Sequence, residues 1–304
     1  MSNMKSVYGA SKDNYTLKVR LKSAGLFLWM VILTIICLLP IYLLIINATR
    51  SHQQIISLTG IKELFIPSNQ LWQNLQDSVH KTNENFSILV GYKNSAIITI
   101  SATFLTVFFS ALTAYGIHVY DFKLKDVSYT AVLAVMMVPV QVTSAGFVSF
   151  MVKLGLTNTF IPLILPAIAA PAVVYFMRSY MKSSFPLDIV EAARIDGSGE
   201  FRTFLTIAIP IMKPAIAVQA IFAFIANWNN FYTPNMILID PNKGGTTNLR
   251  TLPMMLSSLQ SSQKTANYGI IYTAIALSII PIIIAYICLS RFIIEGVALG
   301  GVKE

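Results

Sequence analysis

Charged residues are scarce in this sequence: Asp, Glu, Lys and Arg make up 12% of its 304 residues, whereas a soluble domain carries roughly 25%. The charges that exist lie between long runs that contain none. Six such windows are present, at residues 23–49, 94–120, 127–152, 154–177, 214–239 and 265–290. Each exceeds the ~20 apolar residues that an α-helix needs to cross a bilayer core. The sequence therefore predicts an all-α integral membrane protein with six transmembrane helices.

Acidic residues are absent from all six windows, because the 13 Asp and Glu lie outside them. Among Asp, Glu, Lys, Arg and His, only His118 lies inside a window, near the end of window 94–120. Transporters driven by ions or protons usually place a carboxylate in the membrane, so an ion- or proton-coupled secondary transporter is the weaker alternative. The chain also lacks the Gly-x-x-x-x-Gly-Lys-Ser/Thr loop that binds ATP phosphates. If the protein pumps a solute, a partner must supply the energy.

Catalytic and metal-binding groups are equally sparse. The three histidines are scattered, no Gly-x-Ser-x-Gly nucleophile elbow is present, and a membrane enzyme therefore ranks third. Cys37 and Cys288 lie in different windows, far apart in the sequence, as expected for small packing residues. The net charge of +9 arises from Lys and Arg beside the windows, where membrane topology explains them. We expect no catalytic residue, no metal, no cofactor held by this chain and no nucleic-acid partner.

The distribution of basic residues predicts the orientation. With a cytoplasmic N-terminus, the inside segments carry 14 Lys and Arg and the outside segments carry 8. Because cytoplasmic loops are richer in these residues, both termini are expected in the cytoplasm of a multi-pass protein of the cell membrane. The predicted organisation is a cytoplasmic tail (1–22), a six-span transmembrane domain (23–292) and a second cytoplasmic tail (293–304).

The largest inner loop, residues 183–214, has a pattern of its own. Leu187–Ile195 contains good helix formers, and Gly197 after it suits the left-handed conformation that ends helices. Ser198 can cap a second helix, in which apolar residues recur at i, i+3, i+4 and i+7: Phe201, Phe204, Leu205 and Ala208. This helix–turn–helix is consistent with docking into another protein and, equally, with an interfacial helix among lipid headgroups.

A resemblance favours docking. The loop resembles the EAA loop of ABC-importer permeases, whose pattern is E-A-A, three residues, G, nine residues, I-x-L-P. The matching residues are Glu191, Ala192, Ala193, Gly197, Ile207 and Pro210, with Ile209 in place of the leucine. The resemblance implies the type I ABC importer permease fold, in which this loop is the coupling helix that contacts the cytoplasmic ATPase. The implied ATPase-coupling residues are Glu191, Ala192, Ala193, Asp196 and Gly197.

Two further segments are similar to carbohydrate-importer permeases of the MalG type. Residues 220–231 resemble their fifth span, with Asn230 where that family often has an acid, and residues 291–304 resemble their C-terminus. The resemblance implies a core of spans within 94–292, a second permease subunit, two ATPase subunits that bind ATP and Mg, and an extracellular sugar-binding protein. Loops 50–93 and 240–264 would face the binding protein.

The fifth window contains a polar group that physical chemistry can interpret directly. Asn227 lies ~20 Å along a helix that starts at Pro214. Amides there suit sugar hydroxyls, but amides also join membrane helices to one another, and both interpretations stay open. Thr143 and Ser144 in the third window are weaker candidates. The substrate-pathway candidates are Asn227, Trp228, Asn229, Asn230, Phe231 and Gln141. The charge-free pathway favours a neutral, polyhydroxylated cargo, so we expect the permease subunit of an ATP-driven, binding-protein-dependent sugar importer.

Overall fold

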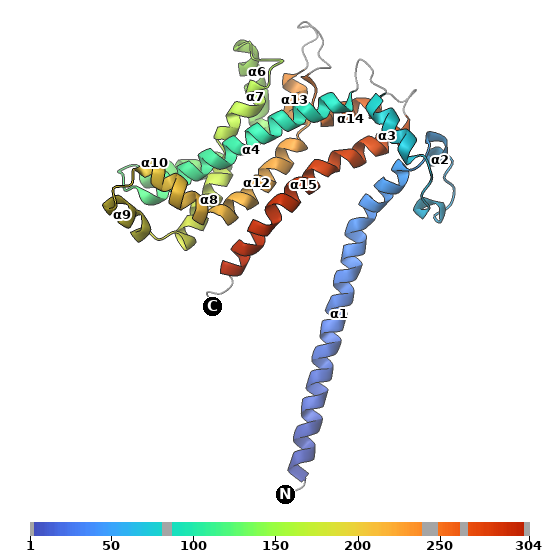
Figure 1. Ribbon diagram of the computed structural model, residues 1–304, viewed down its shortest axis with the longest axis horizontal. Helices are drawn as coiled ribbons and strands as arrows, with labels where there is room; N and C mark the ends of the chain where they lie inside the picture. The colour runs from blue at the N-terminus through green and yellow to red at the C-terminus, as the bar shows by residue number, and fades with distance from the viewer. Residues whose placement is uncertain (1–2, 81–86, 239–248, 262–266, 301–304) are drawn as a thin grey trace. The chain divides into compact units, whose positions relative to one another are not determined.

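The computed structural model describes residues 3–80, 87–238, 249–261 and 267–300, and in these ranges the regular elements are all helical (Figure 1). The prediction of an all-α fold is confirmed for them. In chain order the elements are α1 (Asn3–Ala48), α2 (His52–Ile56), η1 (Glu63–Phe65), α3 (Leu71–His80), α4 (Ile88–Val119), α5 (Lys125–Met136), α6 (Val140–Lys153), α7 (Ile161–Ile164), η2 (Leu165–Ile168), α8 (Pro171–Ser184), α9 (Asp188–Ile195), α10 (Glu200–Thr203), η3 (Phe204–Ala208), α11 (Ile209–Ile211), α12 (Lys213–Trp228), α13 (Tyr232–Ile237), α14 (Leu252–Ser261) and α15 (Tyr268–Gly300).

The chain divides into two compact units, each described by itself below. Unit 1 consists of Met1–Asn74 and Asn267–Ala276, and unit 2 of Leu75–Ala266 and Leu277–Glu304.

Several helices are suited to a membrane. Within the described residues, four are long and apolar enough to cross one: Val19–Ala48, Ile88–Val119, Ile161–Ser184 and Tyr268–Phe292. Two consecutive helical segments, Glu200–Ile211 and Lys213–Trp228, are long and apolar enough to cross a membrane only when they are taken together, and the chain bends by 81° between them. The protein is therefore a multi-pass helical membrane protein, and its fifth predicted span is entered through a sharp bend between Pro210 and Pro214.

The third and fourth predicted windows differ from the helices observed. Window 127–152 holds two shorter helices, α5 and α6, because Pro139 adopts an extended conformation and has no N–H to continue a helix. The helical segment in the fourth window starts at Ile161 and continues to Ser184, past Arg178. Arg178 is 8% exposed, and its guanidinium lies 3.7 Å from the centre of the Tyr129 ring. This cation–π contact explains how the helix accommodates a charge that the window excluded.

In unit 1, buried polar side chains hold the end of α1. Arg50 is 3% exposed and donates hydrogen bonds to the Asn47 side chain and to the carbonyls of Glu63 and Ile66. The Asn74 amide donates to the carbonyls of Ala48 and Arg50. These bonds satisfy carbonyls that a helix end would otherwise leave unpaired. Gly269 packs so closely here that a Cβ atom would overlap the Arg50 carbonyl.

Unit 2 is built around α4, which packs against α8, α12 and α14. Small residues such as Ala111 and Ala114, both fully buried, let neighbouring helices approach it. At its N-terminal end, Asn94 donates to the Arg250 carbonyl, and the Leu252 N–H donates to the Ser95 hydroxyl. These two bonds fix the start of α14 beside α4 and thereby position one wall of the pocket described below.

Candidate coupling segment and transport pocket

The coupling segment, which we define as residues 188–203, has the predicted order of helix, glycine turn and helix. Helix α9 ends at Ile195 with Asp196 as its C-cap, and Gly197 follows with φ of 78°, a left-handed conformation that favours glycine. The cap of the second helix differs from the prediction. Gly199, not Ser198, is its N-cap, and the Ser198 hydroxyl instead accepts a hydrogen bond from Thr203.

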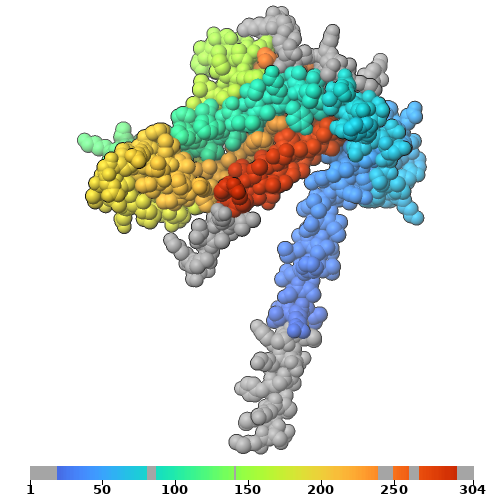
Figure 2. All heavy atoms as spheres, in the orientation of Figure 1, coloured from blue at the N-terminus to red at the C-terminus, as the bar shows by residue number. Residues whose placement is uncertain are grey.

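Helix α9 has a buried side and an exposed side. Val190 and Ala193 are 1% and 6% exposed, and Val190 belongs to an apolar cluster with Tyr115, Phe185 and Phe204. Ile195 on the outer side is 86% exposed. The other four predicted coupling residues, unlike Ala193, are exposed: Glu191, Ala192, Asp196 and Gly197. The segment thus rests on an apolar cluster through Val190 and exposes four of its five predicted contact residues. In Figure 2 it lies, in yellow, at one end of the part of the molecule drawn in colour.

A shallow groove of about 530 Å³ lies along the coupling segment. It combines apolar and polar residues from both sides of the glycine turn, namely Ile189, Ala192, Ala193, Asp196, Gly197, Ser198, Arg202, Thr206 and Ile207. An open, mixed surface of this kind suits contact with another protein better than enclosure of a small ligand.

Three polar groups surround the turn. Arg194 Nε donates to Glu200 Oε1 at 2.7 Å, and the Tyr120 hydroxyl donates to Glu200 Oε2 at 2.8 Å. The hydrogen bond from Arg194, and then that from Tyr120, hold the pKa of Glu200 below its ordinary value. Burial, and then the hydrogen bond to Glu200, raise the pKa of Tyr120 to about 12. Glu200 is therefore ionised and Tyr120 neutral at physiological pH.

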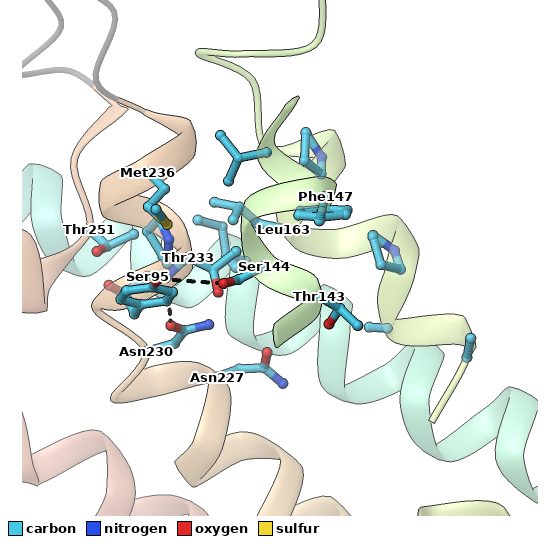
Figure 3. Close-up of a pocket in the computed structure, with 18 residues that line it drawn as sticks. Ser95, Thr143, Ser144, Phe147, Leu163, Asn227, Asn230, Thr233, Met236 and Thr251 are labelled. Carbon is cyan, nitrogen blue, oxygen red and sulfur yellow. Dashed lines mark hydrogen bonds between the residues drawn. The ribbon is translucent and has the colours of Figure 1, made fainter. Parts of the chain in front are cut away.

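The second site is a pocket of about 450 Å³ in unit 2 (Figure 3). Its 18 lining residues come from α4, α6 to η2, the α12–α13 region and the start of α14, and none of those described is charged. The lining residues with polar side chains are Ser95, Thr143, Ser144, Asn227, Asn230, Tyr232, Thr233 and Thr251. A pocket of hydroxyls and amides on an apolar background can exchange hydrogen bonds with a neutral polyol without burying a charge.

The structure separates the pathway candidates of the fifth span. Asn227 and Asn230 line the pocket. The Asn227 amide also donates to the Ala223 carbonyl, and the Asn230 side-chain oxygen accepts from the Thr233 N–H. Asn229 and Phe231 are exposed and are not among the lining residues. Gln141 is part of α6, but its side chain lies outside the described residues.

Trp228 has a packing role instead. Its side chain is 3% exposed, its indole N–H donates to the Ser278 carbonyl at 3.0 Å, and its ring stacks on Phe224 with centroids 5.8 Å apart. An indole in this environment has no free face for a pyranose ring, and the pocket lining does not include it. Two adjacent residues, Asn227 and Trp228, thus lie in different environments.

Sequence reasoning missed half of the polar lining: Ser95, Tyr232, Thr233 and Thr251. Ser95 and Thr251 are brought together by α4 and α14, whose contact no local pattern reveals. Tyr232 and Thr233 directly follow the predicted residues 227–231, so extending the polar stretch to the next helix was the available signal. The Tyr232 and Ser144 hydroxyls, which both line the pocket, lie 3.4 Å apart.

A multi-pass helical fold with a polar, uncharged pocket and an exposed helix–turn–helix defines a membrane transport subunit, and comparison with known proteins agrees. Residues 106–298 match the family described as binding-protein-dependent transport system inner membrane component. The chain belongs to this family.

Individual relatives are similar over most of their length. The chain is 33% identical to the arabinooligosaccharides transport system permease protein of Halalkalibacterium halodurans, over 88% of this chain and 92% of that protein. It is 30% identical to the lactose transport system permease protein of Rhizobium radiobacter, over 69% and 74% respectively. The crystal structure of a bacterial ABC transporter involved in the import of the acidic polysaccharide alginate has a chain of the same fold, with a TM-score of 0.72, 18% identity, and coverage of 90% of this chain and 96% of that one.

Proposed function

We propose that this chain is the permease subunit of an ATP-driven, binding-protein-dependent importer of a neutral sugar or oligosaccharide. The observation that carries the proposal is the coupling segment, a short helix and glycine turn that rests on the core of unit 2 through Val190 and exposes Glu191, Asp196 and Gly197. By this proposal, ATP binding closes two partner ATPases, the coupling segment moves with them, and the pocket changes the side from which it is accessible.

The pocket supports the proposed substrate class. Its described lining contains amides, hydroxyls and apolar groups but no charge, so a phosphorylated or acidic sugar would be buried without a counter-ion. The names of two relatives, an arabinooligosaccharide permease and a lactose permease, refer to neutral sugars. Asn227 and Asn230 are the proposed substrate contacts of the fifth span.

The proposed assembly has four kinds of partner. They are a second permease subunit, two cytoplasmic ATPase subunits that hold ATP and Mg, an extracellular sugar-binding protein, and the lipid bilayer. The proposed topology has both termini and the coupling segment on the cytoplasmic side, and the bias of Lys and Arg supports it. This chain performs no chemistry and supplies the path and the mechanical connection.

The first experiment is affinity purification of the tagged protein from its native membranes, with mass spectrometry of what copurifies. We expect an ATPase with a phosphate-binding loop, a second permease and a sugar-binding protein. The sugar that this binding protein recognises can then be identified in binding assays, with arabinotriose and lactose as the first probes. Uptake of that sugar should continue in a protonophore while ATP is maintained. Repeated recovery of the chain alone, together with uptake abolished by the protonophore, would show that it is a secondary transporter.

Gly197→Trp tests the coupling segment directly. The glycine is exposed, and a Cβ atom there meets open space, so the fold tolerates the bulk while docking on a partner does not. Gly197→Ala is the matched control, since it adds the same backbone strain without the ring. Gly197→Trp is expected to abolish ATP-dependent uptake, whereas Gly197→Ala should only reduce it. Normal uptake in Gly197→Trp would contradict the proposed docking site.

A further inference from the structure

The coupling segment contacts the rest of unit 2 in two chemically different ways. On one side, Val190 and Ala193 are buried, and Val190 packs in a cluster of apolar and aromatic side chains. On the other, Glu200 accepts hydrogen bonds from two elements: Tyr120, which follows the last residue of α4, and Arg194 in α9. The Arg194 guanidinium also lies 5.8 Å from the centre of the Tyr120 ring, within the range of a cation–π contact. We call these three residues the polar tie.

The two attachments restrain different motions. Apolar contacts have no preferred direction, so the buried side alone leaves an eight-residue helix free to roll about its axis. Hydrogen bonds weaken steeply when they are misaligned. One carboxylate that receives donors from α9 and from the end of α4 therefore fixes the rotation of α9 relative to α4, an element that lines the pocket with Ser95 and Ile98.

Stability is a poor explanation for the polar tie. The Arg194 and Glu200 side chains are 42% and 40% exposed, and exposed ion pairs contribute little to folding because water and salt screen them. The tie does join residues that are 80 positions apart, Tyr120 and Glu200. Its geometric effect is thus larger than its energetic one.

We infer that Tyr120, Glu200 and Arg194 are positioning residues that transmit rotation of the coupling segment to α4 and hence to the pocket. This inference rests on the proposed function, because it concerns how an ATPase moves the pocket. In the absence of the polar tie, the ATPases still dock and hydrolyse ATP. Helix α9 then rotates about its own axis without moving α4, and the accessibility of the pocket changes less when the ATPases close.

The test measures pocket accessibility and needs no sugar. The experiment uses the purified complex in lipid nanodiscs. Cys37 and Cys288 are replaced by Ser, and the pocket residue Ala169 is replaced by Cys. The reaction rate of this thiol with a charged methanethiosulfonate reagent is measured with and without ATP and vanadate. We expect Tyr120→Phe to reduce the ATP-dependent change in this rate by about fivefold, the low end of typical coupling between two sites, while ATPase activity and copurification persist. Tyr175→Phe removes a hydroxyl from a similarly exposed tyrosine of α8 and should have no effect.

Two more variants distinguish positioning from general damage. Glu200→Gln keeps one oxygen that can accept from Arg194, and its NH2 group can donate to the Tyr120 hydroxyl. This variant should therefore retain most of the change, whereas Glu200→Ala should lose it. Adding Tyr120→Phe to Glu200→Ala should produce no further loss, because both remove the same contact. A normal response in Tyr120→Phe, or additive losses, would overturn the inference. If the accessibility change is also normal in Gly197→Trp, the proposed function itself is wrong. If the change is lost in Gly197→Trp but normal in Tyr120→Phe, only the role of the polar tie is rejected.

Discussion

The coupling segment and the pocket belong to the same unit but are constructed differently. The coupling segment is a single stretch, residues 188–203, that carries charges on an exposed surface. The pocket collects uncharged residues from elements more than 150 positions apart, such as Ser95 and Thr251. A surface that another protein must contact can be encoded locally, because the partner supplies the other half. A cavity requires its own walls, so its residues are dispersed along the chain. Four predictions examine this difference, in order of decreasing effect.

The largest effect is expected for Trp228, which sits behind the pocket and not in it. Trp228→Ala removes a ring that stacks on Phe224 and is 3% exposed. Truncation of a buried Trp costs about 3–5 kcal/mol of folding free energy. The purified variant should therefore show a much lower melting temperature in detergent and a lower yield.

Phe231→Ala is the matched comparison for Trp228, since this nearby aromatic side chain is 39% exposed. Its melting temperature should remain close to that of the wild type. If Trp228→Ala were equally stable and lost only sugar uptake, Trp228 would belong to the pathway and the separation described above would be wrong.

The second effect concerns the uncharged lining of the pocket. Thr233→Glu places a carboxylate among lining residues of which none that the structure describes carries a charge. The cost of burying this carboxylate exceeds the ~1.4 kcal/mol that corresponds to a tenfold change. Uptake of a neutral sugar should fall by at least about tenfold. Thr233→Val keeps the volume and should reduce uptake only a few-fold. Equal uptake by Thr233→Glu and the wild type would show that the pocket is not on the pathway.

The third effect compares two glycines with the same conformation. Gly155 and Gly197 have φ of 67° and 78°, and at both a Cβ atom would meet open space. Substitution by Ala should therefore cost each about 1–2 kcal/mol through backbone strain alone. Both variants should lose similar stability, measured by thermal unfolding, whereas the ATPase activity stimulated by the binding protein should fall further in Gly197→Ala. Equal losses of activity would mean that the turn conformation has no special role in coupling.

The coupling segment could be predicted almost completely from the sequence. Its first helix and its glycine turn follow from residues that are adjacent in the chain, and the structure confirms them at α9 and Gly197. The apolar stripe predicted for the second helix is only half correct, because Phe204 and Ala208 are buried whereas Phe201 and Leu205 are exposed. The capping role given to Ser198 failed because Thr203, one turn further on, donates its hydroxyl to the Ser198 side chain, while Gly199 starts the helix. This hydrogen bond joins residues only five positions apart, yet the sequence pattern does not reveal it.

The pocket was predicted less well. Hydrophobic runs locate spans but not their breaks, so they reveal neither the interruption of the third span at Pro139 nor the 81° bend before α12. These breaks decide which side chains turn inward. Asn227 and Asn230 could be identified as polar groups in a span, but the burial of Trp228 depends on Phe224 and on the Ser278 carbonyl of another helix. Likewise, the hydroxyls of Ser95 and Thr251 become neighbours of the pocket only through the packing of α4 with α14.

The smallest effect on stability is expected for substitution of Glu200, the residue at which the polar tie's contribution to folding must be distinguished from its role in coupling. Because the pKa of Glu200 is lower in the fold than its ordinary value of 4.5, the folded state favours the ionised carboxylate. This contribution is complete at neutral pH and is lost as the pH falls below 4.5 through the folded value. Glu200→Gln should therefore lower the melting temperature slightly at neutral pH. This difference should shrink in high salt and disappear once the pH has fallen below the folded pKa of Glu200. A large decrease at neutral pH would show that the polar tie holds the fold together, and would remove the distinction between its small energetic role and its role in coupling.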